Sequence, residues 1–329
     1  MACKINIDLG NGKQMPALGF GTWQATDAEL ENALESALEA GYRHIDTAYV
    51  YENEAVIGRV LTKWIKDGRL KREDLFIVTK LPPTGNKPSG VEKFLTRSLK
   101  NLNVDYLDLY LVHTPFTFAE RGEDIHPFNE NGEILIDTST DHVAVWKEME
   151  KQLKAGKTKS IGISNFNKKQ IERILSNCEI KPSNLQIELH LYFQQNELVN
   201  YCKGKGITIT AYSPLGAPGI GVLLKKLNAA KEIPDELANE TVKKIAEKYN
   251  VTPAQILLRY TVQRGIAAIP KSINPTRIKA NISIFHFELD NGDITELKAL
   301  DQGSSGRVCD FKFFKGIDKH PEYPFPECL

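Results

Sequence analysis

The chain has 329 residues, of which 41% are hydrophobic and 26% are charged, a composition typical of folded globular proteins and unlike that of disordered chains. Its 42 lysines and arginines balance its 42 aspartates and glutamates, so no overall charge attracts nucleic acid or an anionic membrane. We therefore expect a small-molecule partner and no nucleic-acid or membrane partner.

The first elements in chain order are a hairpin and a series of short strands. Residues 1–12 lack the apolar region of a signal peptide. Residues 4–18 are expected to form a hairpin, because Ile5 and Ile7 alternate with polar residues and Asn11-Gly12 is a pair that favours tight turns. Eight β-branched or aromatic runs follow, each succeeded by an amphipathic helical pattern, at residues 18–20, 44–46, 75–79, 106–112, 160–163, 184–188, 207–211 and 266–269.

Strands that alternate with helices predict a parallel sheet, and eight such units predict a closed (β/α)8 TIM barrel in the α/β class. A doubly wound open sheet is the alternative. Barrels often reach this length as one unit, so we expect residues 1–329 to form a single domain with the hairpin as a cap on its bottom. Two helices show clear boundaries: Thr26-Asp27 opens one that stops at Gly41, and Thr252-Pro253 opens another before Gly265.

Three segments interrupt or follow this alternation. Residues 116–141 are rich in glycine, proline and acidic residues, and residues 216–234 form a second long loop. Long loops inside a compact domain usually serve function, and loops after strands 4 and 7 lie on the catalytic face of a barrel. The aromatic, proline-rich tail after Leu300 is expected to cover the mouth of the barrel as a third wall of the pocket.

Four titratable residues lie at or just after the ends of neighbouring strands: Asp46, Tyr51, Lys80 and His113. Each of them, taken alone, has a simpler interpretation. Asp46 could cap a helix, Tyr51 could be a packing residue, Lys80 could be a solvated cation, and His113 could be a histidine of the core. Strand ends of a barrel converge on one mouth, however, so three ionisable groups at successive strand ends indicate an active site.

This set suits the reduction of a carbonyl group. Hydride addition creates an alkoxide, which requires a proton donor and hydrogen bonds to the developing charge. We expect Tyr51 to be the acid, with its pKa lowered by the ammonium group of Lys80. Asp46 would pair with Lys80, and a neutral His113 would orient the carbonyl oxygen.

Carbonyl reduction requires a cofactor that supplies a hydride. The sequence lacks the Rossmann motif GxGxxG at the start of a βαβ unit, so this cofactor is expected to bind at another kind of site. The last strand instead leads into IPKSINPTRIKAN, which places Lys271, Ser272 and Arg277 at the start of a short helix. Helix starts near strands 7 and 8 are the usual phosphate sites of barrels, and this set suits a 2′-phosphate, hence NADPH. A solvated basic helix start is the alternative.

Polar residues at three later strand ends complete a possible cofactor floor. Ser164 and Asn165 follow strand 5, Gln186 lies on strand 6, and their hydroxyl and amide groups could hold a carboxamide. Tyr212 ends strand 7 and offers a flat ring on which a nicotinamide can stack.

Long motifs in the same order resemble the aldo-keto reductase superfamily, in particular its aldose-reductase-like branch. They span nearly the whole chain: LGFGTW, GYRHIDTAYVYENE, IVTKL, YLDLYLVHTP, GKTKSIGISNFN, QIELH, GITITAYSPLG, IPKSINPTRIKAN and EYPF. The overall pattern also bears a looser similarity to insect 3-dehydroecdysone reductases. The resemblance implies a barrel oxidoreductase that uses NADP(H).

The resemblance also assigns roles to residues. It places the family's catalytic tetrad on Asp46, Tyr51, Lys80 and His113. It implies that the cofactor contacts are Gly21, Thr22, Trp23, Asp46, Ser164, Asn165, Gln186, Tyr212, Ser213, Leu215, Lys271, Ser272, Arg277 and Asn281. An acidic residue expected before Asn281 is Ala280 here, which removes one adenine contact.

The substrate residues implied by the resemblance are Trp23, Tyr51, His113, Thr114, Phe116 and Cys309. Pro82 and Thr114 stand where aldose reductases carry tryptophans, so we expect a wider pocket. Phe118, Phe311, Phe313 and Phe314 could line an apolar bowl or simply pack within the loops. Cys309 could be a redox-sensitive thiol of the pocket edge or an inert one.

The five cysteines are Cys3, Cys178, Cys202, Cys309 and Cys328, an odd number without CxxC or metal-like spacing. We therefore expect reduced thiols, no metal site and a cytoplasmic protein. The main hypothesis is a monomeric, NADPH-dependent reductase of apolar aldehydes and ketones. The alternatives are an NADP-binding regulatory subunit with little turnover, and a barrel isomerase or lyase that uses the same lysine.

Overall fold

A single parallel sheet forms the centre of the computed structural model, which describes residues 3, 5–226 and 233–325. The strand order in the sheet follows the order in the chain, so each helix crosses over to the adjacent strand. The strands are β3 (Phe20–Gly21), β4 (His44–Asp46), β5 (Phe76–Leu81), β6 (Leu109–Val112), β7 (Ile161–Ser164), β8 (Asn184–Glu188), β9 (Thr208–Tyr212) and β10 (Ala267–Ala268).

Backbone hydrogen bonds between the first and last strands close this sheet into a barrel. The N–H of Gly19 donates to the carbonyl of Ala268 at 2.8 Å, and the N–H of Ala268 donates to Ala17 at 2.8 Å. Leu18 and Ala268 form a parallel bridge, and Gly21 donates to Pro270 at 3.1 Å. The predicted barrel is therefore confirmed, and the open sheet is excluded.

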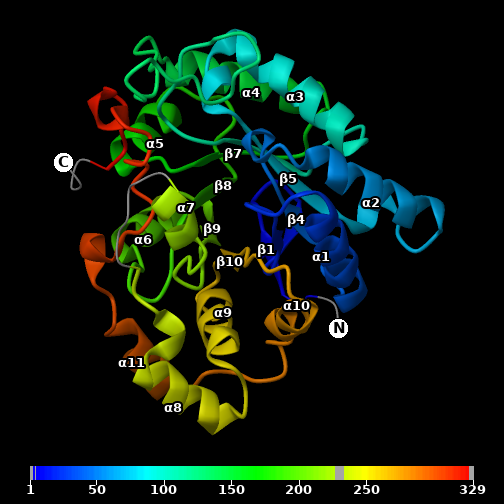
Figure 1. Cartoon of the computed structure of the whole chain (residues 1–329), viewed down its shortest axis with the longest axis vertical. Helices are drawn as coiled ribbons and strands as arrows, with labels where there is room; N and C mark the ends of the chain where they lie inside the picture. Colours follow the sequence, from blue (N-terminus) through cyan, green and yellow to red (C-terminus); the bar gives the residue numbers. More distant parts are fainter. Residues whose placement is uncertain (1–2, 4, 227–232, 326–329) are drawn as a thin grey trace.

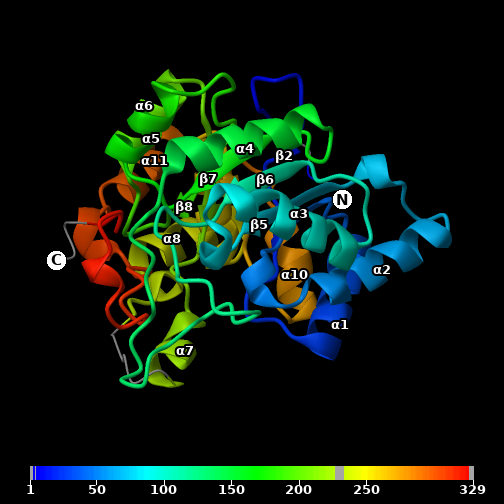
Figure 2. The same cartoon turned by 90° about the horizontal axis from the view of Figure 1, so that it is seen from above.

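Helices lie around the outside of the barrel and, in the case of α7, over the carboxyl ends of its strands (Figures 1 and 2). They are α1 (Asp27–Ala40), α2 (Glu54–Lys66), α3 (Pro88–Leu102), α4 (His142–Lys154), α5 (Lys168–Leu175), α6 (Asn196–Gly204), α7 (Ile220–Lys226), α8 (Glu240–Tyr249), α9 (Pro253–Gln263), α10 (Pro275–Ile282) and α11 (Asn291–Lys298). Both predicted helix boundaries are confirmed. Gly41 ends α1 with a φ of 102°, and the Thr252 hydroxyl caps α9 by accepting a hydrogen bond from the N–H of Gln255.

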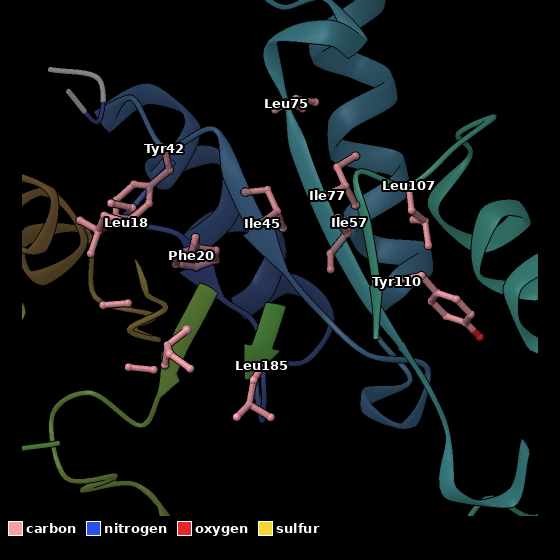
Figure 3. Close-up of a cluster of buried hydrophobic side chains, with 14 of the residues drawn as sticks. Leu18, Phe20, Tyr42, Ile45, Ile57, Leu75, Ile77, Leu107, Tyr110 and Leu185 are labelled. Carbon is pink, nitrogen blue, oxygen red and sulfur yellow. The ribbon is translucent and has the colours of Figure 1, made fainter. Parts of the chain in front are cut away.

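Side chains alternate along each strand between the barrel interior and the helix layer. On β5, Phe76 and Val78 belong to an interior cluster with Leu109 and Leu111 of β6, whereas Ile77 packs against the helices. Figure 3 shows Ile77 in the outer layer of apolar side chains, between strands and helices. The same period of two places the next residue of the inner face, Lys80, inside the barrel at its carboxyl end.

The N-terminal hairpin consists of β1 (Asn6–Asp8) and β2 (Gln14–Pro16). Its Met15 is fully buried in the interior cluster, so the hairpin caps the barrel as predicted. The connection, residues 9–13, is longer than the tight turn that Asn11-Gly12 favours. Gly10 and Gly12 provide the positive φ angles of this longer loop, and the Asn11 amide donates to the Ser160 hydroxyl at 2.9 Å.

The long segments gather at the opposite end of the barrel. In Figure 2, α7 lies at the bottom of the view and the hairpin at the top. The loop after β6 and the tail form one aromatic cluster, in which Phe116 contacts Phe311 with ring centroids 5.3 Å apart and Phe118 contacts Phe314 at 5.2 Å. The segment 216–234, expected as a loop, contains the short helix α7, and its residues 227–232 lie outside the described part of the chain.

Candidate active site

The fold brings Asp46, Tyr51, Lys80 and His113 together at the carboxyl ends of β4, β5 and β6. The Lys80 ammonium donates to the Asp46 carboxylate at 2.6 Å and to the carbonyl of Thr47 at 2.8 Å. Its Nζ lies 5.1 Å from the ring centroid of Tyr51, which is held in a 3-10 turn, Tyr49–Tyr51. The rings of Tyr51 and His113 contact each other edge to face at 5.8 Å.

Electrostatics around Tyr51 differ from the expectation drawn from the sequence. Burial raises the pKa of Tyr51 well above its usual value, and the nearby Asp46 carboxylate and Cys309 raise it further. Burial also lowers the pKa of Lys80, although Asp46 partly offsets that effect. The expected lowering of the Tyr51 pKa by Lys80 is therefore wrong, because Asp46 neutralises the ammonium charge and burial disfavours a phenolate. Tyr51 is a fully protonated phenol at neutral pH.

His113 is half-buried and uncharged. Burial lowers its pKa well below 6.5, and the nearby Lys80 lowers it further. Among the described residues, its Nδ1 atom has no hydrogen-bond partner. A neutral imidazole has one N–H donor, so His113 can donate one hydrogen bond to an acceptor in the site.

Amide side chains form the floor beside these four residues. Gln186 donates from its amide to the second oxygen of Asp46 at 2.7 Å. Asn165, whose φ is 66°, donates to the His113 carbonyl at 2.9 Å and accepts a hydrogen bond from the Tyr212 hydroxyl at 2.8 Å. The network orients both amides and the Tyr212 ring at the carboxyl ends of β7, β8 and β9.

Basic side chains lie at the other side of the same cavity, where β10 leads into α10. Asn274 caps this helix by accepting from the N–H of Arg277 at 3.0 Å. The Ser272 hydroxyl lies 3.5 Å from Nε of Arg277, and Lys271 donates to the carbonyl of Gln24 at 3.4 Å. Two cations and a hydroxyl therefore line the cavity at or near one helix start, an arrangement that can attract a phosphate.

One cavity of about 1050 Å³ connects these groups. All the predicted site residues line it except Lys80, which lies beneath Asp46 and is fully buried. Its outer wall is aromatic, with Phe116, Phe118, Phe128, Phe311, Phe313 and Phe314. Thr114 lines the cavity, but Pro83 does so in place of the expected Pro82.

Comparisons with known proteins place the chain in a family. Residues 17–302 match the model of the Aldo/keto reductase family. The chain belongs to the aldo-keto reductase family. It is 41% identical over 327 residues to chicken aldo-keto reductase family 1 member A1, with 97% of each chain covered, and 41% identical over 325 residues to the human protein of that name, with 96% and 97% covered.

A solved structure agrees with this assignment. The aldose reductase of Schistosoma japonicum is 41% identical, with a TM-score of 0.87, and the match covers 100% of both chains. The chain is accordingly an oxidoreductase of a family that reduces carbonyl compounds. These relatives do not bear on the similarity to insect 3-dehydroecdysone reductases, which stays a prediction.

Sequence reasoning missed several residues that line the cavity. His126 and Phe128 line the cavity from the loop after β6, as does Leu237 from a short 3-10 turn, Glu236–Ala238. His126 and Phe128 could have been found from the sequence, because they are aromatic side chains in an otherwise acidic loop. Leu237 gave no signal, because its position depends on how the segment after α7 folds back.

No group of three or more histidine, cysteine, aspartate or glutamate side chains in residues 3, 5–226 and 233–325 is arranged to hold a metal ion. Within those same ranges, every helix is too short or too polar to cross a membrane.

Proposed function

We propose that this aldo-keto reductase converts aldehydes and ketones to alcohols with NADPH, and that Tyr51 donates the proton. The observation that carries the proposal is the contact of a protonated Tyr51 with the buried Lys80 and with a neutral His113 at the floor of one cavity. NADPH supplies a hydride when it is bound. The residues of this chain then have to position the carbonyl and deliver a proton.

The chemistry of the lining residues fits that cofactor. Lys271, Ser272 and Arg277 would hold its 2′-phosphate, because Ser272 and Arg277 lie side by side and all three residues line the same cavity. Asn165 and Gln186 would hold the carboxamide, since both amides are already oriented by hydrogen bonds. Gly21, Thr22, Trp23, Asp46, Ser164, Tyr212, Ser213, Leu215 and Asn281 line the same cavity and are proposed as further contacts.

Proton delivery follows from the hydrogen bonds of Lys80. An ammonium group has three N–H donors, and Asp46 and Thr47 use two of them. The third can stabilise the Tyr51 phenolate as it forms, so the proton leaves the phenol only while negative charge develops on the substrate oxygen. Neutral His113 would donate its one N–H to that oxygen and orient the carbonyl.

The aromatic wall supports a neutral, apolar substrate. Phe116, Phe118 and Phe311 are packed against one another at the outer side of the cavity. The described lysine and arginine side chains that line the cavity, Lys271 and Arg277, lie on the side of the proposed cofactor. We therefore propose that bulky ring-bearing carbonyl compounds are preferred over compounds with a carboxylate, which would be desolvated without a partner. Trp23, Thr114 and Cys309 would complete the substrate site.

The test follows NADPH absorbance with a panel of neutral and anionic carbonyls. Tyr51→Phe should lower kcat by about 10²- to 10⁴-fold, the range for a lost general acid, while the Kd for NADPH changes by less than about twofold. Tyr49→Phe is the matched control, because Tyr49 lies in the same turn and packs on Phe94 away from Lys80. NADPH binding without consumption by any carbonyl would instead support the regulatory-subunit alternative.

We also infer that the enzyme acts as a monomer in the cytoplasm. The described cysteines, Cys3, Cys178, Cys202 and Cys309, are free thiols, which fits a reducing compartment. Cys328 lies outside the described residues. Size-exclusion chromatography with light scattering, and fractionation of cells, would test the two inferences; a stable dimer or a secreted product would contradict them.

A further inference from the structure

A buried ionic bridge lies beside the pocket and takes no part in the proposed chemistry. It consists of Glu188, His190 and Glu236, each at most 3% exposed. Nε2 of His190 lies 3.0 Å from a Glu188 oxygen, and Nδ1 lies 2.5 Å from a Glu236 oxygen. Both ring nitrogens face carboxylates, so both donate and the imidazole is protonated. We call this set the His190 bridge.

The Glu188 end of the bridge holds the tail. Glu188 is the last residue of β8, two residues beyond Gln186 of the cofactor floor. Its two oxygens accept hydrogen bonds from the N–H of Val308 at 2.7 Å and from the N–H of Cys309 at 2.8 Å. Cys309 in turn lines the pocket. The strand end therefore fixes the first part of the tail that reaches the substrate side.

The Glu236 end holds the opposite wall. Glu236 accepts from the N–H of Tyr192 at 3.0 Å and from the N–H of Leu191 at 3.3 Å. It also packs under Gly216, where an added methyl group would lie 3.0 Å from the Glu236 side chain. Both neighbours of Gly216 and the residue after Glu236, Leu237, line the cavity. Glu236 is thus wedged beneath the loop after β9.

The charges around the bridge are compensated. Backbone N–H groups reach both carboxylates, and the imidazolium lies between them. The other titratable or charged groups nearby are Cys309, Tyr212 and Arg307, whose guanidinium stacks on Phe193. Burial raises the pKa of Cys309 and of Tyr212, and the Glu188 carboxylate adds to both effects, so neither competes with His190 for a proton change near neutral pH.

We propose that His190 is a positioning residue. Its imidazolium, held between Glu188 and Glu236, fixes the position of the tail at Cys309 relative to the opposite side of the cavity at Gly216 and Leu237. The kinetic test of this proposal rests on the proposed reductase function, because the bridge would set the width of the pocket in which the carbonyl substrate binds. Loss of the bridge should weaken substrate binding more than it slows the chemical step, since the hydrogen bonds of Glu188, His190 and Glu236 go to one another and to the backbone of other segments rather than to Tyr51, Lys80 or His113.

The decisive variant is Glu236→Gln, which preserves shape and removes one carboxylate. At pH 7.5 the KM for a bulky carbonyl should rise by about tenfold, a typical effect for a packed coupling network, with kcat changed by less than about twofold. Deprotonation of His190 would also break the bridge, so we expect the KM of the wild-type enzyme to rise at alkaline pH. In Glu236→Gln, His190 has one ionic partner fewer, and this rise should begin at a lower pH. Glu240→Gln is the matched control, since its side chain is 88% exposed and pairs with Lys243.

A second readout needs no turnover. Hydrogen exchange of the Val308 and Cys309 amides should be faster in Glu236→Gln and unchanged in Glu240→Gln. Wild-type enzyme that consumes no carbonyl would refute the reductase function, while faster exchange in Glu236→Gln would still support the bridge. Exchange and a pH profile of KM identical to those of the wild-type enzyme would overturn the proposal.

Discussion

The His190 bridge makes folding stability depend on pH in a defined window. Burial alone would lower the pKa of His190, but its hydrogen bonds and attraction to Glu188 and Glu236 outweigh burial and raise the pKa to about 9. The unfolded value is about 6.5, so the shift of roughly 2.5 units corresponds to about 3 kcal/mol. A raised folded pKa means that the contribution is fully present below pH 6.5 and is lost as the pH rises through 9.

Urea unfolding of the wild-type chain and of His190→Gln at pH 6, 7, 8, 9 and 10 measures this contribution. Glutamine retains hydrogen-bonding capacity but cannot take up the proton, so the difference in the free energy of unfolding should shrink by about 3 kcal/mol between pH 6 and pH 10. Within the window, the slope should approach about 1.4 kcal/mol per pH unit. His286→Gln, at an exposed position, controls for the loss of a histidine. A difference that stays constant with pH would refute the assignment of a protonated His190.

Three further outcomes are expected elsewhere in the molecule. Asp46→Asn should destabilise the fold by about 3–5 kcal/mol in urea unfolding, because it leaves the buried Lys80 ammonium without its carboxylate; a change below about 1 kcal/mol would contradict this account. Gly58→Ala should cost about 1–3 kcal/mol, since the new methyl group would lie 2.4 Å from the carbonyl oxygen of Asn101; calorimetry showing an unchanged Tm would argue against close packing of α2 on α3. Lys271→Ala should raise the KM for NADPH by about tenfold or more and that for NADH much less, and equal effects in steady-state kinetics would count against recognition of the 2′-phosphate.

Features that depend on the two-residue alternation of side chains along a strand could be predicted from the sequence. Alternation along β5 places Lys80 on the interior face together with Phe76 and Val78, and strand ends of a barrel share one mouth. The location of the tetrad therefore follows from counting residues within strands. The exact ends of β3 and β10 do not, because those strands are two residues long and are set by the closure of the barrel rather than by local preference.

Features that depend on the folding back of distant segments were not predictable. Glu236 reaches His190 across 46 residues, and no pattern in either segment indicates that contact. The direction of the Tyr51 pKa was also misjudged, because it depends on the degree of burial and on the pairing of Lys80 with Asp46, neither of which a spacing reveals. The sequence predicts a loop where helix α7 lies, because glycine and proline dominate the residues just before the helix.

The tail has a consequence for the order in which the enzyme becomes competent during its synthesis. Strands β3 to β10 and their helices precede residue 300, so the barrel can close while the tail is still being made. Until Val308 and Cys309 emerge, however, the buried carboxylate of Glu188 lacks two of its donors, and the Phe116 cluster lacks Phe311. In a chain that is still being synthesised, the barrel and the floor of the cavity would therefore form first, and the aromatic wall would be completed only after the tail emerges.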